Sequence, residues 1–378
     1  MTTPHKHRAR VAQAAADQLG RADLATLPAL VGFDGFIDSI TRLVGTRRTM
    51  AGNDFTPVST IGEFGARVLD AAGRSTNIEA VRVEDRFGGN GPLYAGALGR
   101  LGVAVTYIGA LGTGGPGSPV LPVFEPFAAR CREVVTLGTP STTLCLEFDD
   151  GKVMINDRGN VQAVTWELLG SVPGHDALRA MVSRSRLVCV VNWSLMGGVQ
   201  GILEGLTGMP YQGRTFVDLS DPTPRTAEDV RSCLAVLGRL ERVTLGLNLA
   251  EAECVSRVLG LASLDGTPGA GALVSAARAI RERVGVSCVV IHPREGAAGA
   301  TDRGEAAWFD GPLCAKPKIS TGAGDHFNAG FSVAQTLEMP LEQCLAMGTA
   351  LSGAYVRDAA SPTKERLVEF LRALPLRD

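Results

Sequence analysis

Residues Thr321-Gly322-Ala323-Gly324-Asp325 combine a turn of small residues with one carboxylate, directly before an apolar-periodic stretch from His326 to Leu337. A helix that starts with small residues leaves backbone N–H groups bare at the positive end of its dipole, so it can hold an anion. Asp325 lies beside this site and could accept a hydroxyl proton. The combination suits phosphoryl transfer to an alcohol. The same residues are also typical of a tight strand-to-helix turn with an acidic residue in the first turn of the helix. Other parts of the chain are needed to distinguish a catalytic site from such a turn.

Two earlier segments carry groups that bind hydroxyl-rich ligands. Gly88-Gly89-Asn90-Gly91-Pro92 precedes an apolar-periodic stretch, which predicts a helix opened by Pro92 and ended by Gly102. The glycines let a ligand approach the backbone, and Asn90 offers a donor and an acceptor. Asp34 and Asp38 follow the first apolar run and could accept hydrogen bonds from sugar hydroxyls. The glycine loop could also be only a tight connection, and either Asp only a turn residue.

A third segment, Asn248-Leu249-Ala250-Glu251, follows another apolar run. Asn248 would lie at the end of a strand, with Glu251 in the first turn of the next helix. An amide and a carboxylate placed in this way suit the water shell of Mg²⁺ and neighbouring phosphates. Asn caps and first-turn Glu are also common in ordinary helices, so this signal is weak when taken alone.

Other nucleotide and metal signatures are weak. Gly112 to Gly117 matches G-x-G-x-x-G after an apolar run, but Pro116, Pro119 and Pro122 disfavour the long helix that a dinucleotide site needs. The sequence contains no G-x-x-x-x-G-K-[ST] loop, which excludes a Walker-type kinase. The five histidines and eight cysteines show no metal-ligand spacing, and no Cys-x-x-Cys pair occurs.

Composition excludes several classes of protein. A chain of 378 residues with 45% hydrophobic residues can bury a large core, and its net charge of −2 gives no sign of a nucleic-acid partner. The segment from Met1 to Arg10 is basic but is not followed by the apolar stretch of a signal peptide. No apolar run approaches the length of a membrane span. We therefore expect a cytoplasmic protein with neither a membrane nor a nucleic-acid partner.

Short apolar runs alternate with stretches of helical periodicity. This alternation predicts an α/β fold with a mostly parallel, Rossmann-like sheet covered by helices on both faces. Ligands bind such sheets beyond the carboxyl ends of the strands, which draws attention to polar residues such as Asn192, Asp218 and Asp221. The predicted strands are Ala29–Phe33, Val103–Leu111, Leu187–Asn192, Thr215–Leu219, Val243–Leu247 and Val286–Ile291, and predicted helices include Thr226–Leu240, Ala250–Leu259 and Ala272–Val284.

Two stretches, residues 41–87 and 141–160, break the alternation with strand-like period-2 pieces. We expect them to form a small β-rich lid over the carboxyl edge of the sheet. The first also contains a helix start, because Thr60 and Glu63 have the spacing of a capping box. Residues 1–28 are expected to form an added N-terminal helix, and residues 29–378 the main domain with its lid segments.

In their order along the chain, these motifs resemble the ribokinase-like (PfkB) carbohydrate kinase family. The resemblance runs from about Ala29 to the end of the chain, and Thr321 to Asp325 is its strongest part. Its other parts are the Asp-bearing first strand, the Gly88-Gly89 loop, Asn248-x-x-Glu251 and a final match over Ala346–Pro362.

The resemblance implies a Rossmann-like core with a β-lid, ATP and Mg²⁺ as cofactors, and phosphorylation of a sugar hydroxyl. Asp325 would be the general base, and the N–H groups of Gly322, Ala323 and Gly324 the anion hole. The sugar and the nucleotide would be the small-molecule partners, and a homodimer through the lid could form. The implied sugar-binding residues are Asp34, Asp38, Gly88, Gly89 and Asn90; the implied nucleotide-binding residues are Asn248, Glu251, Gly296 and Thr321, with Glu251 reaching the metal through water.

The chain departs from the family pattern at three points. Ile319 replaces an Asp that is tied to a monovalent-cation site, which puts potassium activation in doubt. In the nucleotide loop, residues 291–296, only Gly296 matches, and Leu93 stands where an Asn is frequent. A nucleoside or sugar-acid kinase on the same fold is therefore an alternative, with Arg158 as the residue to meet an acid. A non-catalytic sugar-binding relative is another, although the presence of Asp325 argues against it.

Overall fold

The computed structural model describes residues 3–50 and 54–375, and within them the chain forms two β-sheets. The ends of the expected ranges 1–28 and 29–378, and residues 51–53 of the expected lid segment 41–87, lie outside the described residues. The larger sheet has nine strands in the order β14-β13-β12-β11-β10-β9-β1-β5-β6. Its strands run parallel except at β13, which is antiparallel to both of its neighbours.

Six strands of the larger sheet, β1, β5, β9, β10, β11 and β12, coincide with the predicted apolar runs, which confirms the predicted fold class; β6, β13 and β14 were not predicted. Residues of β1 and β11 are almost all buried, as expected for strands covered on both faces. The bounds are β1 Pro28–Phe33, β5 Ala104–Gly109, β6 Glu133–Thr136, β9 Leu187–Val190, β10 Arg214–Asp218, β11 Val243–Leu247, β12 Cys288–Ile291, β13 Gly296–Thr301 and β14 Ala306–Asp310.

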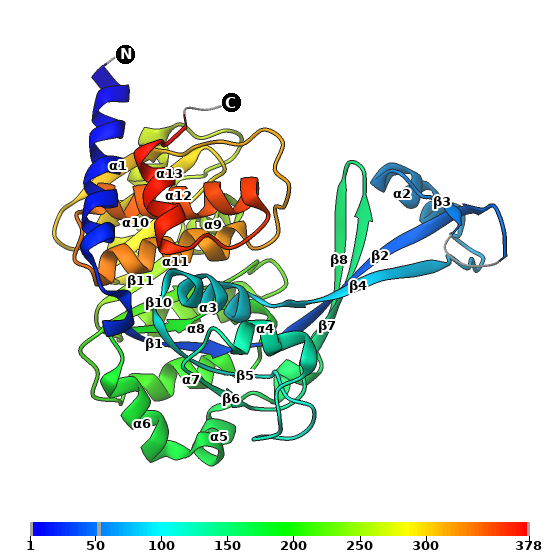
Figure 1. Ribbon diagram of the computed structural model, residues 1–378, viewed down its shortest axis with the longest axis horizontal. Coiled ribbons are helices and arrows are strands. Elements are labelled where there is room, and N and C mark those ends of the chain that lie inside the picture. Colours follow the sequence, from blue (N-terminus) through cyan, green and yellow to red (C-terminus); the bar gives the residue numbers. More distant parts are fainter. Residues whose placement is uncertain (1–2, 51–53, 376–378) are drawn as a thin grey trace.

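Helices cover the two faces of this sheet and form two separate hydrophobic clusters (Figure 1). One cluster includes α1, α3, α11, α12 and α13, and the other α6 to α10. Short 3-10 turns join several of these elements. The helices are α1 Thr3–Arg21, α3 Asn90–Leu101, α4 Glu125–Ala128, α5 Trp166–Leu169, α6 His175–Arg184, α7 Val199–Leu206, α8 Ala227–Leu237, α9 Leu249–Leu259, α10 Ala270–Val284, α11 Ala323–Thr336, α12 Leu341–Asp358 and α13 Lys364–Arg372.

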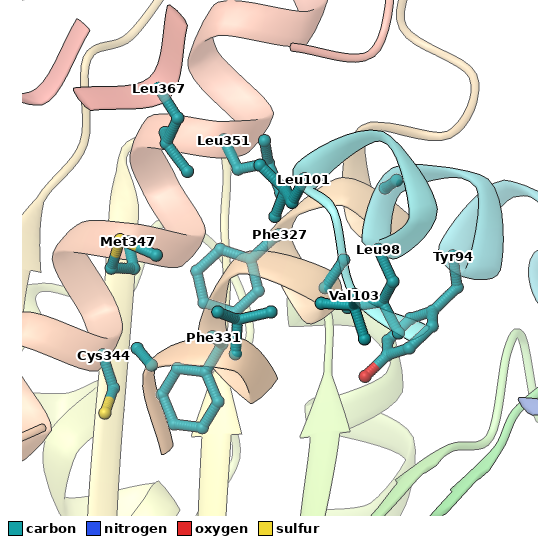
Figure 2. Close-up of a cluster of buried hydrophobic side chains, with 14 of the residues drawn as sticks. Tyr94, Leu98, Leu101, Val103, Phe327, Phe331, Cys344, Met347, Leu351 and Leu367 are labelled. Carbon is teal, nitrogen blue, oxygen red and sulfur yellow. The ribbon is translucent and has the colours of Figure 1, made fainter. Parts of the chain in front are cut away.

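Helix α11 is the most deeply buried helix of the first cluster, with every residue from Asp325 to Thr336 buried. Figure 2 shows Phe327 and Phe331 of α11 lying among Met347 and Leu351 of α12 and the side chains of α3. This packing holds the helix start that carries the Thr321 to Asp325 motif in a fixed place against the sheet.

The N-terminal helix α1 belongs to the same cluster. It lies beside α12 and α13, so the two ends of the described chain are close together (Figure 1). Arg8 of α1 donates hydrogen bonds to the backbone carbonyls of Asp310, Leu374 and Pro375. The helix expected at the start of the chain is therefore an integral part of the core. No helix in the described ranges is both long enough and apolar enough to cross a membrane.

The second sheet, here called the lid sheet, projects from one side of the core (Figure 1). It comprises β2 Phe36–Arg47, β3 Phe55–Pro57, β4 Ala80–Gly88, β7 Ser141–Phe148 and β8 Gly151–Asp157, and carries helix α2 Ile61–Asp70. These strands come largely from the two expected lid segments. That the lid sheet closes over a ligand stays a prediction.

Local details differ from the expectations at two helix starts. Thr60 caps α2 as expected by accepting the N–H of Glu63 at 3.1 Å, but the Glu63 carboxylate accepts from Ser59 N instead of Thr60 N. Helix α3 starts at Asn90, which places Pro92 at the third helical position instead of the first. Both differences are shifts of one or two residues, the usual margin at a helix end.

We predict that Phe331→Ala destabilises the protein by about 3–5 kcal/mol, because it opens a cavity in the fully buried α11–α12 interface. The matched change Leu69→Ala, at a side chain that is 75% exposed on α2, should cost no more than about 0.5 kcal/mol. Urea unfolding measures both free energies. Equal losses would contradict the placement of α11 in the core.

Candidate active site

The Thr321 to Asp325 motif lies between two cavities. Ala323 and Gly324 line the larger cavity, of about 620 Å³. Thr321, Gly322 and Asp325 line the smaller one, of about 310 Å³. The start of α11 is thus a shared wall, with Ala323 and Gly324 on the side of the larger cavity and Gly322 and Asp325 on the side of the smaller one.

Asp325 is a buried carboxylate, with 7% of the residue exposed. Its Oδ1 atom accepts a hydrogen bond from Asn90 Nδ2 at 3.1 Å. Burial raises the pKa of Asp325 well above its usual value, and the nearby charges of Asp218 and Asp34 add to the effect. A carboxylate with a raised pKa is a better proton acceptor for a sugar hydroxyl.

The turn before α11 is held by contacts beneath it. Gly322 has a φ of 83°, a left-handed conformation that a glycine adopts without strain. Tyr355 donates its hydroxyl to the Thr321 carbonyl at 2.8 Å, and a ring nitrogen of His326 lies 2.6 Å from the Gly322 carbonyl. Ala323 N–H donates to the carbonyl of Ser320 at 3.2 Å, so this expected anion-hole donor is already engaged.

His326 has a structural role that the sequence did not reveal. Its second ring nitrogen lies 2.9 Å from Ser361 Oγ, and the ring stacks on Tyr355 with centroids 3.6 Å apart. Burial lowers the pKa of His326 to about 4, so the ring is neutral near pH 7. His326 therefore holds the turn as a neutral ring, through its hydrogen bonds and its stacking on Tyr355.

Asp38, Gly89 and Asn90, which the sequence analysis predicted to bind the sugar, line the smaller cavity. Burial raises the pKa of Asp38 to about 6. Gly88 lies behind Asp38: a Cβ atom there would come within 2.3 Å of the carboxyl carbon. Gly88 therefore makes room for the Asp38 side chain and is not among the described residues that line the cavity.

Asp34 is also placed differently from the expectation. It is fully buried and is not among the described residues lining either cavity. Its carboxylate accepts hydrogen bonds from Gly91 N at 2.9 Å and Asn192 Nδ2 at 2.6 Å, and Tyr107 donates to its backbone carbonyl. Asp34 thus anchors the loop that carries Asn90, and burial raises its pKa to about 6.

Asn248 and Gly296, which the sequence analysis predicted to bind the nucleotide, line the larger cavity. Glu251 forms a reciprocal capping box with Asn248, with N–H···O distances of 2.8 and 2.9 Å, and is not among the described lining residues. Thr321, expected at the nucleotide, lines the smaller cavity instead. Thr321 precedes the first residue of α11 and lies on the side of the turn that faces the smaller cavity.

Several residues that the sequence analysis did not assign to the site line the cavities. Asn192 and Asp221 were noted in the sequence as polar residues after predicted strands but were given no role, and the others were missed because tertiary folding brings them to the site. Arg158 is exposed and is not among the described residues lining the smaller cavity. The additional polar lining residues are Thr143, Asn156, Asn192, Ser194, Ser220 and Asp221 in the smaller cavity, and His292, Arg294, Cys314, Ser320, Thr349 and Ser352 in the larger one.

Acidic side chains gather around Glu251, where a divalent cation would bind. Within the described ranges, no group of three or more His, Cys, Asp or Glu side chains is arranged to hold a metal directly. Burial raises the pKa of Glu251 well above its usual value, and the charges of Asp218, Asp221 and Asp325 contribute. A hydrated cation would relieve this repulsion, so the site fits Mg²⁺ bound through water and phosphate.

The large, mostly parallel sheet with its covering helices gives the chain a ribokinase-like fold. Solved structures of this fold include ribokinase from Thermotoga maritima (17% identity, TM-score 0.62, covering 92% of this chain and 99% of that one). Arabidopsis thaliana ribokinase complexed with ribose and ATP is similarly close (16% identity, TM-score 0.61, covering 92% and 98%).

A more specific assignment comes from the sequence comparisons. The family model for prokaryotic ketohexokinase matches residues 5–373, and the chain belongs to this family. A ketohexokinase from Haloferax volcanii is 28% identical over 384 residues, covering 98% of this chain and 97% of that one. The protein is accordingly a sugar kinase, a phosphotransferase with an alcohol group as acceptor. The family match includes helix α1, in line with its place in the core.

We predict that Gly88→Ala raises the KM for the sugar by about 10-fold or more, because the new methyl group would displace the Asp38 carboxylate at a cost of about 1–3 kcal/mol. Steady-state kinetics with varied sugar measures the effect. The control is Gly65→Ala on α2, where a Cβ atom meets no described atom within 4 Å. An unchanged KM in Gly88→Ala would show that Asp38 does not contact the sugar.

Proposed function

We propose that the protein transfers the γ-phosphoryl group of ATP to a hydroxyl of a ketohexose. The observation that carries the proposal is the position of the Thr321 to Asp325 motif between the two cavities. The larger cavity would take the nucleotide and the smaller one the sugar. The reacting groups would then meet at the start of α11.

In this mechanism Asp325 accepts the proton of the attacking hydroxyl, with Asn90 holding the carboxylate by its 3.1 Å hydrogen bond. The N–H groups of Gly322, Ala323 and Gly324 stabilise charge on the transferred group, helped by the dipole of α11. Ala323 N–H would have to exchange its bond to Ser320 for one to phosphate. Mg²⁺, when bound through water near Asn248 and Glu251, supplies neutralisation of phosphate charge.

The lining of the smaller cavity supports a neutral polyol as acceptor. The cavity has carboxylate, amide and hydroxyl groups, and no Arg, Lys or His side chain occurs among the described residues that line it. A sugar acid would bring a negative charge next to Asp38 and Asp325, and Lys152 and Arg86, whose charges act on Asp38, are not among the described residues that line the cavity. This disfavours the sugar-acid alternative, while a nucleoside acceptor on the same fold is left to the assay.

The direct test measures ADP release from ATP, with Mg²⁺ present, when ketohexoses, aldoses, sugar acids or nucleosides are offered as acceptors. We expect turnover with a ketohexose. If only nucleosides were phosphorylated, the ketohexose proposal would be wrong and the acceptor would be a nucleoside. Sugar binding without any turnover would support a non-catalytic sugar-binding protein instead.

We predict that Asp325→Asn lowers kcat by about 10²- to 10⁴-fold, because a general base is lost, while KM for the sugar changes far less. Asp176→Asn, at an exposed residue in the first turn of α6, is the matched control and should keep full activity. A comparable loss in kcat and in sugar affinity would argue that Asp325 binds the sugar and is not the base.

We also propose that the lid sheet carries the contact surface of a homodimer. In the described part of the chain, all exposed large apolar side chains lie in the lid segments. Leu144 of β7 pairs with Ile155 of β8, and the alternation of side chains puts both on the face opposite Asp38 and Thr143. We propose that a second copy of the chain covers this apolar face, because a two-fold axis brings the same face of both copies together.

We expect the wild-type protein to sediment as a dimer and the double change Leu144→Glu with Ile155→Lys to sediment as a monomer. Thr207→Lys, on the exposed surface of the core, is the control and should stay dimeric. Sedimentation velocity at several protein concentrations measures the oligomeric state of each protein. A monomeric wild-type protein, or a dimer that survives the double change, would rule out this surface.

A further inference from the structure

Two buried polar atoms beside the smaller cavity lack a hydrogen-bond partner. In the described part of the chain, Asn192 Oδ1 and Ser194 Oγ are buried without a partner, and both residues line this cavity. Only 1% of either residue is exposed. A buried polar atom left unpaired costs about 1–3 kcal/mol, so its presence calls for an explanation such as a ligand.

The orientation of the Asn192 amide follows from its neighbour. Asn192 Nδ2 donates to Asp34 Oδ2 at 2.6 Å. A carboxylate only accepts, so the NH₂ group has to face Asp34 and the Oδ1 atom has to face away from it. Asn192 therefore presents an acceptor to the cavity.

Asp34 is itself fixed on its other side. Its Oδ1 atom accepts from Gly91 N at 2.9 Å and lies 3.3 Å from the Tyr107 hydroxyl. Gly91 follows Asn90, which is bonded to the carboxylate of Asp325. One buried carboxylate therefore positions both the Asn192 amide and the loop next to the proposed base.

The backbone after Asn192 is held rigid as well. Asn192 has φ 63° and ψ 41°, a left-handed conformation that Asn tolerates better than most residues. Arg225 donates to the carbonyls of Trp193, Ser194 and Met196 at 2.9 to 3.2 Å, and its guanidinium lies 5.0 Å from the Trp193 ring centroid. Such support is what a preorganised binding wall requires.

From this geometry, and resting on the proposed function, we infer that Asn192 and Ser194 select the stereochemistry of the sugar. Asn192 Oδ1 accepts a hydrogen bond from one sugar hydroxyl, and Ser194 Oγ bonds another. Both are hydroxyls other than the one that Asp325 deprotonates. Asp34 is the positioning residue that keeps the acceptor of Asn192 turned toward the sugar.

The test compares D-fructose with ketohexoses that differ from it at one carbon: D-psicose, D-tagatose and L-sorbose. Asn192→Gly removes the amide and keeps the left-handed backbone, and Ser194→Ala removes the hydroxyl. We expect each to raise KM for the preferred sugar by about 5- to 100-fold with little change in kcat, and to lower its preference over at least one epimer by a similar factor. Ser256→Ala is the matched control, because Ser256 Oγ is also buried without a partner among the described residues but its side chain lines neither cavity.

Asp34→Asn tests the positioning role. Because the Gly91 N–H needs the oxygen of the new amide, its NH₂ group would face Asn192, whose own amide would then rotate and turn a donor toward the cavity. We expect the same loss of epimer preference as in Asn192→Gly, and no further loss of preference when the two changes are combined. Additive losses would show that Asp34 does not act through Asn192.

The outcomes separate this inference from the proposed function. If the wild-type protein phosphorylates a different sugar, the ketohexose assignment fails, and the same variants are measured with that sugar and its epimers. If the wild-type protein turns over a ketohexose but Asn192→Gly and Ser194→Ala keep its epimer preference, the inference is overturned and the function stands. Ser194→Ala alone decides the matter if thermal unfolding shows that Asn192→Gly does not fold.

Discussion

The burial of helix α11 is the constraint on which the rest of the site depends. Its start lies between the two cavities and presents Asp325 to the smaller one, although every residue from Asp325 to Thr336 is buried. The hydrophobic contacts of Phe327 and Phe331 with α12 supply the free energy that offsets the desolvation of Asp325. Contacts from Tyr355 and His326 then fix the turn at Gly322.

Burial also explains the electrostatics around the smaller cavity. Asp34, Asp38 and Asp325 are all withdrawn from water, and each has a raised pKa for that reason. The carboxylates differ in function because their hydrogen-bond partners differ. Asp34 is saturated by donors of the protein itself, whereas Asp38 and Asp325 face the cavity, where hydroxyl donors can reach them.

The sequence was informative about elements and less so about side chains. Apolar runs such as Val243–Leu247 predicted strands correctly, because a run buried on both faces leaves a continuous pattern. The Thr321 to Asp325 turn was located by local composition. Asp34, Asn192 and His326 owe their roles to hydrogen bonds with residues far away in the chain. Local spacing carries no information on such pairings, so they emerged only from the folded structure.

The packing of α1 against α13 has a consequence for how the chain folds. Helix α1 is synthesised well before its partners α12 and α13, and Arg8 donates hydrogen bonds to carbonyls more than 300 residues further along the chain. Such distant pairings slow folding, since a long loop has to close before they are formed. During synthesis α1 has to wait with its apolar face uncovered, and the emerging chain is open to chaperones until α13 has left the ribosome.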